Sequence, residues 1–266
     1  MPTKDKMPFG SIFADMKDVI LETADNKKIS LGGGLLPKIA LKILGIPHIG
    51  LRMRASVIFR MLGGKRHGRV LDAGCGPGTY SLTLASNGFE VSGFDINKKK
   101  VSQAIKISRE LDIPVNFSVA NVYHLKKYKS NCFDVVICSD VLEHLKNDSL
   151  AVKELARLLK DDGKLIITVP TDTKLNRKYK KSFGHERLYM LQSMSELLRK
   201  NGLIIEKSIS YLCFFGRMSW IINRSLFRSK ILTAITFPPL FMLTYLDYLF
   251  NLGGGEGIAV KAVKQH

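Results

Sequence analysis

Residues 70–79 read VLDAGCGPGT, an apolar run that passes directly into a glycine-rich turn. Glycine adopts backbone angles that other residues avoid, and a turn without side chains lets a ligand approach the backbone N–H groups at the start of the next helix. The dinucleotide fingerprint G-x-G-x-x-G would require a glycine at position 79, where Thr79 stands. The pattern D-x-G-x-G-x-G therefore favours an adenosyl cofactor without phosphates over one that carries a pyrophosphate.

Outward from this turn, short apolar runs alternate with segments of helical length. The expected strands are Arg69–Ala73, Glu90–Phe94, Val115–Ala120, Phe133–Cys138, Lys164–Val169, Leu203–Ser210 and Gly257–Lys264. The expected helices between them are Thr79–Asn87, Lys98–Glu110, Ser149–Leu159 and Ser193–Lys200. This alternation predicts an α/β fold in which βαβ units build a parallel sheet with helices on both faces. Asp95 follows the second strand at about the spacing of a carboxylate that holds ribose hydroxyls.

Taken in order, these motifs resemble class I S-adenosylmethionine-dependent methyltransferases, in the branch that includes the ubiquinone-type O-methyltransferases. The resemblance runs from about residue 69 to 210 and resumes at the last strand. FDVVICSDVLEH at 133–144 matches the fourth-strand motif of that family, and DDGKL at 161–165 matches the turn into the fifth strand. The resemblance implies a Rossmann-like doubly wound sheet of seven strands with the last antiparallel, and S-adenosyl-L-methionine as cofactor.

The same resemblance implies a set of cofactor-binding residues. In this family the glycine turn surrounds the methionine end of the cofactor, and the acidic residue after the second strand binds the ribose. Asn121 stands where the family often has an Asp facing the adenine amine, and an Asn can still accept that hydrogen bond. The implied residues are Asp72, Gly74, Gly76, Gly78, Asp95, Ile96, Asn121, Val122 and Ser139. No metal site is expected.

Two histidines are candidates for a general base. Methylation of an oxygen requires removal of its proton, and histidine titrates in the range that suits this task. His144 follows the fourth strand, at the sheet edge where ligands bind. His185 lies in GHERLY at 184–189, which resembles an element that borders the acceptor side in this branch. Both histidines also have structural interpretations: His144 as a residue that starts a helix or packs on the cofactor, and His185 as one that orders its loop.

The chain of 266 residues carries 41 Lys and Arg against 23 Asp and Glu, a formal net charge of +18. Such a surplus favours a partner that is acidic, either nucleic acid or an anionic membrane. No carboxylate occurs between Asp25 and Asp72, where Leu35–Leu44 and Ile49–Leu62 are expected to be helical. These helices are either a cap with solvated basic faces or an anchor that lies on a membrane. Residues 174–187 contain six more basic residues, which could attract an anionic headgroup, a phosphate or RNA.

Residues 211–256 form an unusually apolar insertion before the last strand. Ile231–Phe250 is nearly long enough to cross a bilayer. A single crossing would leave Gly257–Lys264 on the far side from its sheet, so we expect a helical hairpin. This hairpin either covers the domain as a lid or enters a membrane from one side. The expected division is therefore a basic extension at 1–66, the core at 67–210, the insertion at 211–256 and the final strand at 257–266.

The functional expectation follows from these features together. We expect a methyltransferase that acts on a small lipid-like or membrane-associated acceptor, with O-methylation favoured. The alternatives are an RNA or protein methyltransferase, and a non-catalytic cofactor-binding protein. Nucleic acid is disfavoured because the aromatic residues do not alternate with Lys and Arg as on a stacking platform. Four cysteines without a C-x-x-C pair and an N-terminus without a secretory pattern favour the cytoplasm, with peripheral membrane contact, and the oligomeric state stays open.

Overall fold

The computed structural model describes residues 21–22, 28–29, 48–63, 67–226, 229–250 and 252–265. The expected helix Leu35–Leu44 lies outside the described residues. The chain divides into two compact units. One consists of residues 65–211 and 254–266, and the other combines the described parts of 1–64 with 212–253. The N-terminal extension and the apolar insertion, which the sequence analysis treated separately, thus belong to one unit.

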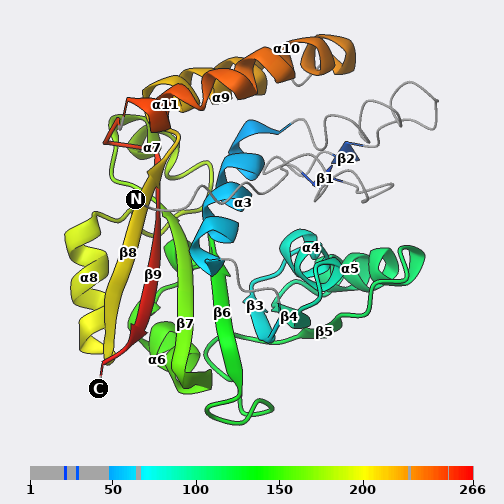
Figure 1. Cartoon of the computed structure of the whole chain (residues 1–266), viewed down its shortest axis with the longest axis vertical. Helices are drawn as coiled ribbons and strands as arrows, with labels where there is room; N and C mark the ends of the chain where they lie inside the picture. Colours follow the sequence, from blue (N-terminus) through cyan, green and yellow to red (C-terminus); the bar gives the residue numbers. More distant parts are fainter. Residues whose placement is uncertain are drawn as a thin grey trace. The chain divides into compact units, whose positions relative to one another are not determined.

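The first unit contains a seven-stranded sheet (Figure 1). Its strands are β3 (Arg69–Ala73), β4 (Glu90–Asp95), β5 (Asn116–Val119), β6 (Phe133–Ser139), β7 (Leu159–Pro170), β8 (Leu203–Tyr211) and β9 (Gly257–Lys264). Their order in the sheet is β5-β4-β3-β6-β7-β9-β8, and β9 pairs antiparallel with both of its neighbours. The other pairings are parallel. The expected doubly wound sheet with an antiparallel last strand is confirmed.

Helices connect these strands as the sequence predicts, with local differences. They are α4 (Thr79–Ser86), α5 (Lys98–Glu110), the 3₁₀ turn η1 (Leu142–His144), α6 (Asp148–Leu158), α7 (Lys174–Tyr179) and α8 (Leu191–Lys200). The turn expected at 161–165 corresponds to an irregularity within β7, which begins at Leu159: residues 160–163 have no partner in the register with β6. There Leu159 pairs with Phe133 before the register with β6 shifts. The short helix α7 was not predicted.

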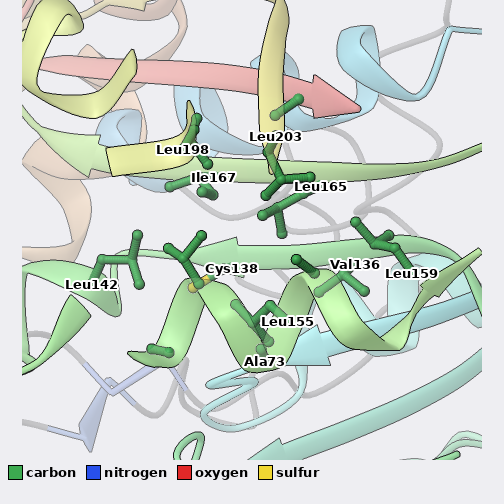
Figure 2. Packing of buried hydrophobic residues seen from close by; sticks show 14 of the residues in the cluster. Ala73, Val136, Cys138, Leu142, Leu155, Leu159, Leu165, Ile167, Leu198 and Leu203 are labelled. Atoms are coloured by element: carbon green, nitrogen blue, oxygen red, sulfur yellow. The ribbon is translucent and has the colours of Figure 1, made fainter. Parts of the chain in front are cut away.

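The core lies between the sheet and the helices that cover it. Figure 2 shows Leu155 of α6 lying against Val136 and Cys138 of β6, while Leu198 of α8 lies beside Ile167 of β7. All five side chains are buried, and removing apolar side chains of this kind from water is the main favourable contribution to folding. The core therefore fixes the carboxyl ends of β3, β4 and β6, where the candidate site lies.

The second unit is helical apart from the small pair of β1 (Leu21–Glu22) and β2 (Lys28–Ile29). Its helices are α3 (Ile49–Leu62), α9 (Phe214–Leu226), α10 (Lys230–Leu243) and α11 (Leu246–Leu249). The expected helix Ile49–Leu62 has the same bounds in the structure, and the insertion is helical, with α9 and α10 in contact with each other. None of the helices among the described residues combines the length and the apolar character needed to cross a bilayer.

Arg52 on α3 corrects one detail of the sequence analysis. A solvated basic face was one interpretation of this helix, but the Arg52 side chain is buried, with 4% of its surface exposed. Its guanidinium carbon lies 5.2 Å from the ring centroid of Phe237 and 4.5 Å from that of Phe241, both on α10. Cation–π contacts of this kind are favourable when desolvated. Arg52 therefore contributes to packing within the unit and is not part of a solvated face.

Candidate functional site

The glycine turn between β3 and α4 places three glycines with positive φ angles, 78° at Gly74, 53° at Gly76 and 85° at Gly78. A side chain at Gly74 would meet Val141 at 2.3 Å, and one at Gly78 would meet Phe117 at 2.7 Å. A Cβ at Gly76 would meet no atom within 4 Å among the described residues. Packing thus explains Gly74 and Gly78, whereas Gly76 borders open space where a ligand can approach the backbone.

Asp95 ties this turn to the end of β4. Its Oδ2 accepts a hydrogen bond from the Gly76 N–H at 3.0 Å, and its Oδ1 accepts one from the Asn97 N–H at 2.8 Å. The Phe94 carbonyl accepts hydrogen bonds from the Gly74 and Cys75 N–H groups at 2.8 and 2.9 Å. Each carboxylate oxygen can accept more than one hydrogen bond, so Asp95 retains capacity for ribose hydroxyls.

Asp72 lies beneath the turn at the end of β3. Its carboxylate is buried and accepts a hydrogen bond from the Ser81 hydroxyl of α4 at 2.6 Å. Burial raises the pKa of Asp72 to about 6, partly offset by the hydrogen bond from Ser81. Asp72 therefore holds the start of α4 against β3 from inside the protein.

Apolar and amide side chains follow β4 and β5 at the same sheet edge. Ile96 is 71% exposed and Val119, at the end of the neighbouring β5, is 52% exposed, so two apolar side chains face solvent at adjacent strand ends. The Asn121 side-chain oxygen accepts a hydrogen bond from the Tyr123 N–H at 3.0 Å. Val122 is buried in the core, so only its backbone can be available to a ligand. This arrangement presents a small apolar surface beside an amide.

The end of β6 is fixed by hydrogen bonds to β7. The Ser139 and Thr168 hydroxyl oxygens lie 2.8 Å apart, and the Thr168 hydroxyl donates to the Asp140 carboxylate at 3.0 Å. The Asp140 N–H donates to the Thr168 carbonyl at 2.9 Å, and Asp140 adopts a φ of 52°, which is uncommon outside glycine. This network turns the chain away from the sheet into η1, which carries His144.

His144 is exposed, and its ring is oriented by the backbone. His144 Nδ1 lies 3.0 Å from the carbonyl oxygen of Gly184. A carbonyl oxygen only accepts hydrogen bonds, so Nδ1 carries the proton, and in the neutral ring Nε2 is the basic nitrogen. Gly184 adopts a φ of 67°, in the left-handed region that favours glycine. The arrangement suits a general base whose tautomer is set by a second group.

His185 packs beside His144, with ring centroids 5.0 Å apart. Its ring also stacks on Phe183 at 5.5 Å, and its Nδ1 is buried without a hydrogen-bond partner among the described residues. Burial and the neighbouring His144 lower the pKa of His185. Possible ligand atoms of Glu143, His144 and His185 all lie within 4.8 Å of one another, so these side chains could hold a divalent cation as two nitrogens and a carboxylate. The sequence analysis expected no metal site.

A clamp of polar contacts holds the two histidine segments together. The Glu143 carbonyl accepts hydrogen bonds from the Glu186 and Arg187 N–H groups at 2.7 and 3.4 Å. The Arg187 guanidinium lies 2.8 Å from the Asp148 carboxylate and donates to the carbonyls of residues 145 and 146 at 2.9 and 2.7 Å. The Tyr189 hydroxyl lies 2.9 Å from the same Asp148 carboxylate. Arg187, expected to attract an anion, is instead engaged in the structure of the site.

The sequence predicts both histidines as site residues, but it predicts neither the contact between their rings nor the polar contacts that hold their segments together. Glu143 was quoted only as part of a motif, and Asp148, Arg187 and Tyr189 were not given positioning roles. Their partners lie some 40 residues away along the chain, as the 40-residue separation of His144 and Gly184 illustrates. One sequence signal points to this arrangement. Glu143 and His144 are neighbours in one segment, and His185 and Arg187 lie close together in the other.

Comparisons with known proteins agree with this geometry. A family model described as a methyltransferase domain matches residues 65–223. The ubiquinone biosynthesis O-methyltransferase of Alkalilimnicola ehrlichii is 33% identical over 116 residues, which cover 44% of this chain and 47% of that protein. The match thus spans about half the length of that relative.

Two solved structures share the fold. One is phosphoethanolamine N-methyltransferase 2 of Haemonchus contortus in complex with S-adenosyl-L-methionine, with a TM-score of 0.60, 21% identity and coverage of 80% of this chain and 52% of that one. The other is magnesium protoporphyrin IX methyltransferase of Synechocystis with bound SAH, with a TM-score of 0.55, 20% identity and coverage of 88% and 89%. At these identities the likeness concerns the fold.

Proposed function

Because the chain belongs to the methyltransferase domain family, we propose that it is an S-adenosylmethionine-dependent methyltransferase that methylates an oxygen of a small lipid-like acceptor. The observation that carries this proposal is that the glycine turn and His144 follow the carboxyl ends of the neighbouring parallel strands β3 and β6. Asp95 fixes the open side of the glycine turn through Gly76, and His144 presents a basic nitrogen at the end of the adjacent β6 segment. The relatives named as ubiquinone biosynthesis O-methyltransferases support the choice of oxygen and of a lipid-like acceptor.

The residues around the turn fit such a cofactor. Gly76 leaves space above the backbone, and the free capacity of the Asp95 carboxylate suits the two hydroxyls of a ribose. Ile96 and Val119 offer exposed apolar side chains for the faces of an adenine, with Asn121 nearby in sequence for its edge. When bound, S-adenosylmethionine supplies an electrophilic methyl group. The remaining task of the protein is to align the acceptor and to remove its proton.

His144 is the proposed general base. Its Nδ1 proton is held by the Gly184 carbonyl, so Nε2 can accept the proton of an acceptor hydroxyl. His185 is proposed as the second residue of the acceptor side, because its lowered pKa keeps it neutral beside His144. A neutral His185 does not repel the positive charge that His144 acquires when it accepts the proton.

The first experiment separates an enzyme from a non-catalytic binding protein. Calorimetry of the full chain with S-adenosylmethionine should detect binding, and incubation of the chain with radiolabelled cofactor and a lipid extract should label a lipid-soluble product. A chain that binds the cofactor but labels no lipid, metabolite, RNA or protein would favour the non-catalytic alternative. Labelling of RNA or protein instead would favour the alternative that the basic residues at 174–181 suggest.

The acceptor can then be identified without prior assumptions. Cells with and without the gene should differ in a lipid or metabolite whose mass decreases by one methylene when the gene is absent. We also propose that the chain works in the cytoplasm at the surface of an anionic membrane, where a lipid-like acceptor would be found. This location is supported by the net charge and by the surface described next.

A further inference from the structure

The hairpin formed by α9 and α10, with the segment up to the short helix α11, buries several polar side chains as well as the apolar Phe237. Asn223, Thr233, Thr244 and Asp247 are buried, although all four side chains are polar. Large apolar side chains of the same two helices are exposed instead. Soluble helices show the opposite pattern, with the apolar stripe turned toward the core.

The buried polar side chains are used for hydrogen bonds within the unit. The Asp247 carboxylate accepts hydrogen bonds from the Phe215 and Gly216 N–H groups, each at 2.8 Å, and so satisfies donors at the start of α9. The Asn223 side-chain oxygen accepts one from the Ile49 N–H of α3 at 3.3 Å. The Thr233 hydroxyl lies 2.8 Å from the Ser229 carbonyl, to which it donates. The polar groups are thus satisfied internally, so the outer surface is left to apolar side chains.

The exposed apolar side chains recur at helical spacing. On α9 they occupy i, i+4, i+7 and i+8, and on α10 they occupy i, i+3 and i+10, so each helix presents one apolar stripe. We call these two stripes the apolar face. Its members are Phe214, Met218, Ile221 and Ile222 on α9, and Leu232, Ile235 and Met242 on α10.

The charged side chains that the structure describes on α9 and α10 are those of Arg217 and Arg224, which are both basic. Asp247 is the only acidic residue in the sequence from 212 to 253, and its carboxylate is buried as a helix cap. The basic residues of that segment are Arg217, Arg224, Arg228 and Lys230. No exposed carboxylate occurs among the side chains that the structure describes in this unit. A face of this kind, apolar with basic residues and without acidic ones, matches the headgroup and acyl boundary of an anionic bilayer.

We propose that the apolar face of α9 and α10 inserts into one leaflet of an anionic membrane and holds the protein at the lipid surface. The proposal deepens the membrane contact put forward under the proposed function and does not depend on methyl transfer. Its occupant is lipid, because the basic residues complement anionic headgroups. A second copy of the chain would bring the same positive charges together.

The test is flotation of the full chain with vesicles of phosphatidylcholine, alone or mixed with phosphatidylglycerol. The double variant Ile221→Glu/Ile235→Glu places a carboxylate on each stripe, at positions 45% and 66% exposed. Ile221 is nearly half exposed and Ile235 mostly exposed, so a carboxylate at either position can reach solvent and the fold should stay intact. The matched control is Ile204→Glu on β8, which is also 45% exposed but lies outside the apolar face.

We expect the wild type and Ile204→Glu to float with the mixed vesicles, and the double variant to partition at least about tenfold less. Equal flotation of the double variant would overturn the proposal, as would a wild-type chain that ignores both kinds of vesicle. A wild-type dimer in light scattering that Ile221→Glu/Ile235→Glu dissociates would show that a second copy covers the face, and would also overturn it.

Calorimetry with S-adenosylmethionine on the same samples separates this proposal from the proposed function. The double variant should bind the cofactor like the wild type, which also shows that it is folded. A chain that floats but binds no cofactor would contradict the proposed function and leave the membrane surface supported.

Discussion

The substitution Gly76→Ala tests whether the open side of the glycine turn is a ligand site. Gly76 has a φ of 53°, and an added Cβ would meet no atom of the described part of the chain within 4 Å. Gly202, after α8, provides a matched control, because its φ is 73° and an added Cβ there also meets nothing within 4 Å. The two substitutions therefore impose a similar backbone strain, and only one of them lies beside the site.

The expected magnitudes follow from this comparison. Placing a non-glycine residue in the left-handed region costs about 1–2 kcal/mol, so both variants should lose roughly that amount of unfolding free energy. For a chain of this size this corresponds to a decrease in melting temperature of about 2–8 °C. Gly76→Ala should in addition weaken S-adenosylmethionine binding by about tenfold or more, since its methyl group occupies the space of the ligand and a 1.4 kcal/mol loss is a factor of ten.

Thermal unfolding and calorimetry of both variants provide the measurement. Equal melting temperatures with cofactor affinity lost only in Gly76→Ala would support the site. If Gly76→Ala binds the cofactor as tightly as Gly202→Ala, the turn is not the cofactor site and the reasoning from its geometry fails.

Three further predictions concern the carboxylate beneath the turn, the base and the clamp. The pKa of Asp72 is raised from an ordinary 3.8 to about 6 in the folded protein. Between pH 3.8 and pH 6 the folded state therefore binds more protons than the unfolded state, so the free energy of unfolding decreases as the pH rises through this range. Urea unfolding of wild type and Asp72→Asn measures this effect. Relative to the variant, the unfolding free energy of the wild type should fall by about 3 kcal/mol between pH 3 and pH 7. A difference that stays constant with pH would contradict the raised pKa of Asp72. His144→Asn should lower kcat by about 10²–10⁴-fold with little effect on cofactor affinity in calorimetry. A larger decrease of kcat in His185→Asn would identify His185, rather than His144, as the general base. Arg187→Gln should cost about 1–3 kcal/mol of stability, because it removes the guanidinium paired with Asp148 and leaves that carboxylate with the hydrogen bond from Tyr189. It should also lower kcat through displacement of His144. A variant that is less stable in unfolding measurements but fully active would show that the clamp does not position the base.

The parts of the fold that the sequence predicts are those with strong local signals. Arg69–Ala73 and Gly257–Lys264 were expected with the same bounds that the structure gives, because each is an apolar run with clear ends. The ends of a strand are predicted less accurately where the local sequence pattern is weak. The aspartates at 161 and 162 indicate a turn before the strand, whereas the structure places them in an irregular stretch inside β7. Leu159 already pairs with Phe133, and the regular register with β6 resumes at Lys164.

The residues of the candidate site also differ in how far the local sequence predicts their roles. The glycine turn with Gly76 and the acidic residue Asp95 are separate motifs, and the sequence predicts both at the cofactor site because each follows a strand that ends at the same sheet edge. It had no means of predicting that Gly184 fixes the tautomer of His144, because that contact depends on how a loop of the folded chain returns to the sheet. The pattern also does not predict the packing around Gly74 and Gly78, since Val141 follows β6 and Phe117 lies on β5.

Several of the basic residues behind the net charge of +18 are buried or already paired with carboxylates. Arg52 is buried against Phe237 and Phe241, Arg187 is paired with Asp148, and Arg177 forms two hydrogen bonds with Asp172 at 2.6 and 2.9 Å. These cations stabilise the fold and contribute little to long-range attraction.

Membrane binding should therefore depend on the apolar face more than on the total charge. Salt screens attraction between exposed charges over about 10 Å at 0.1 M, but it does not weaken burial of apolar side chains. Flotation of the wild type in high salt should consequently fall without being abolished, whereas Ile221→Glu/Ile235→Glu should fail to float at low salt as well. Complete loss of wild-type flotation in high salt would mean that the basic residues act alone and that the exposed side chains of α9 and α10 do not enter the lipid.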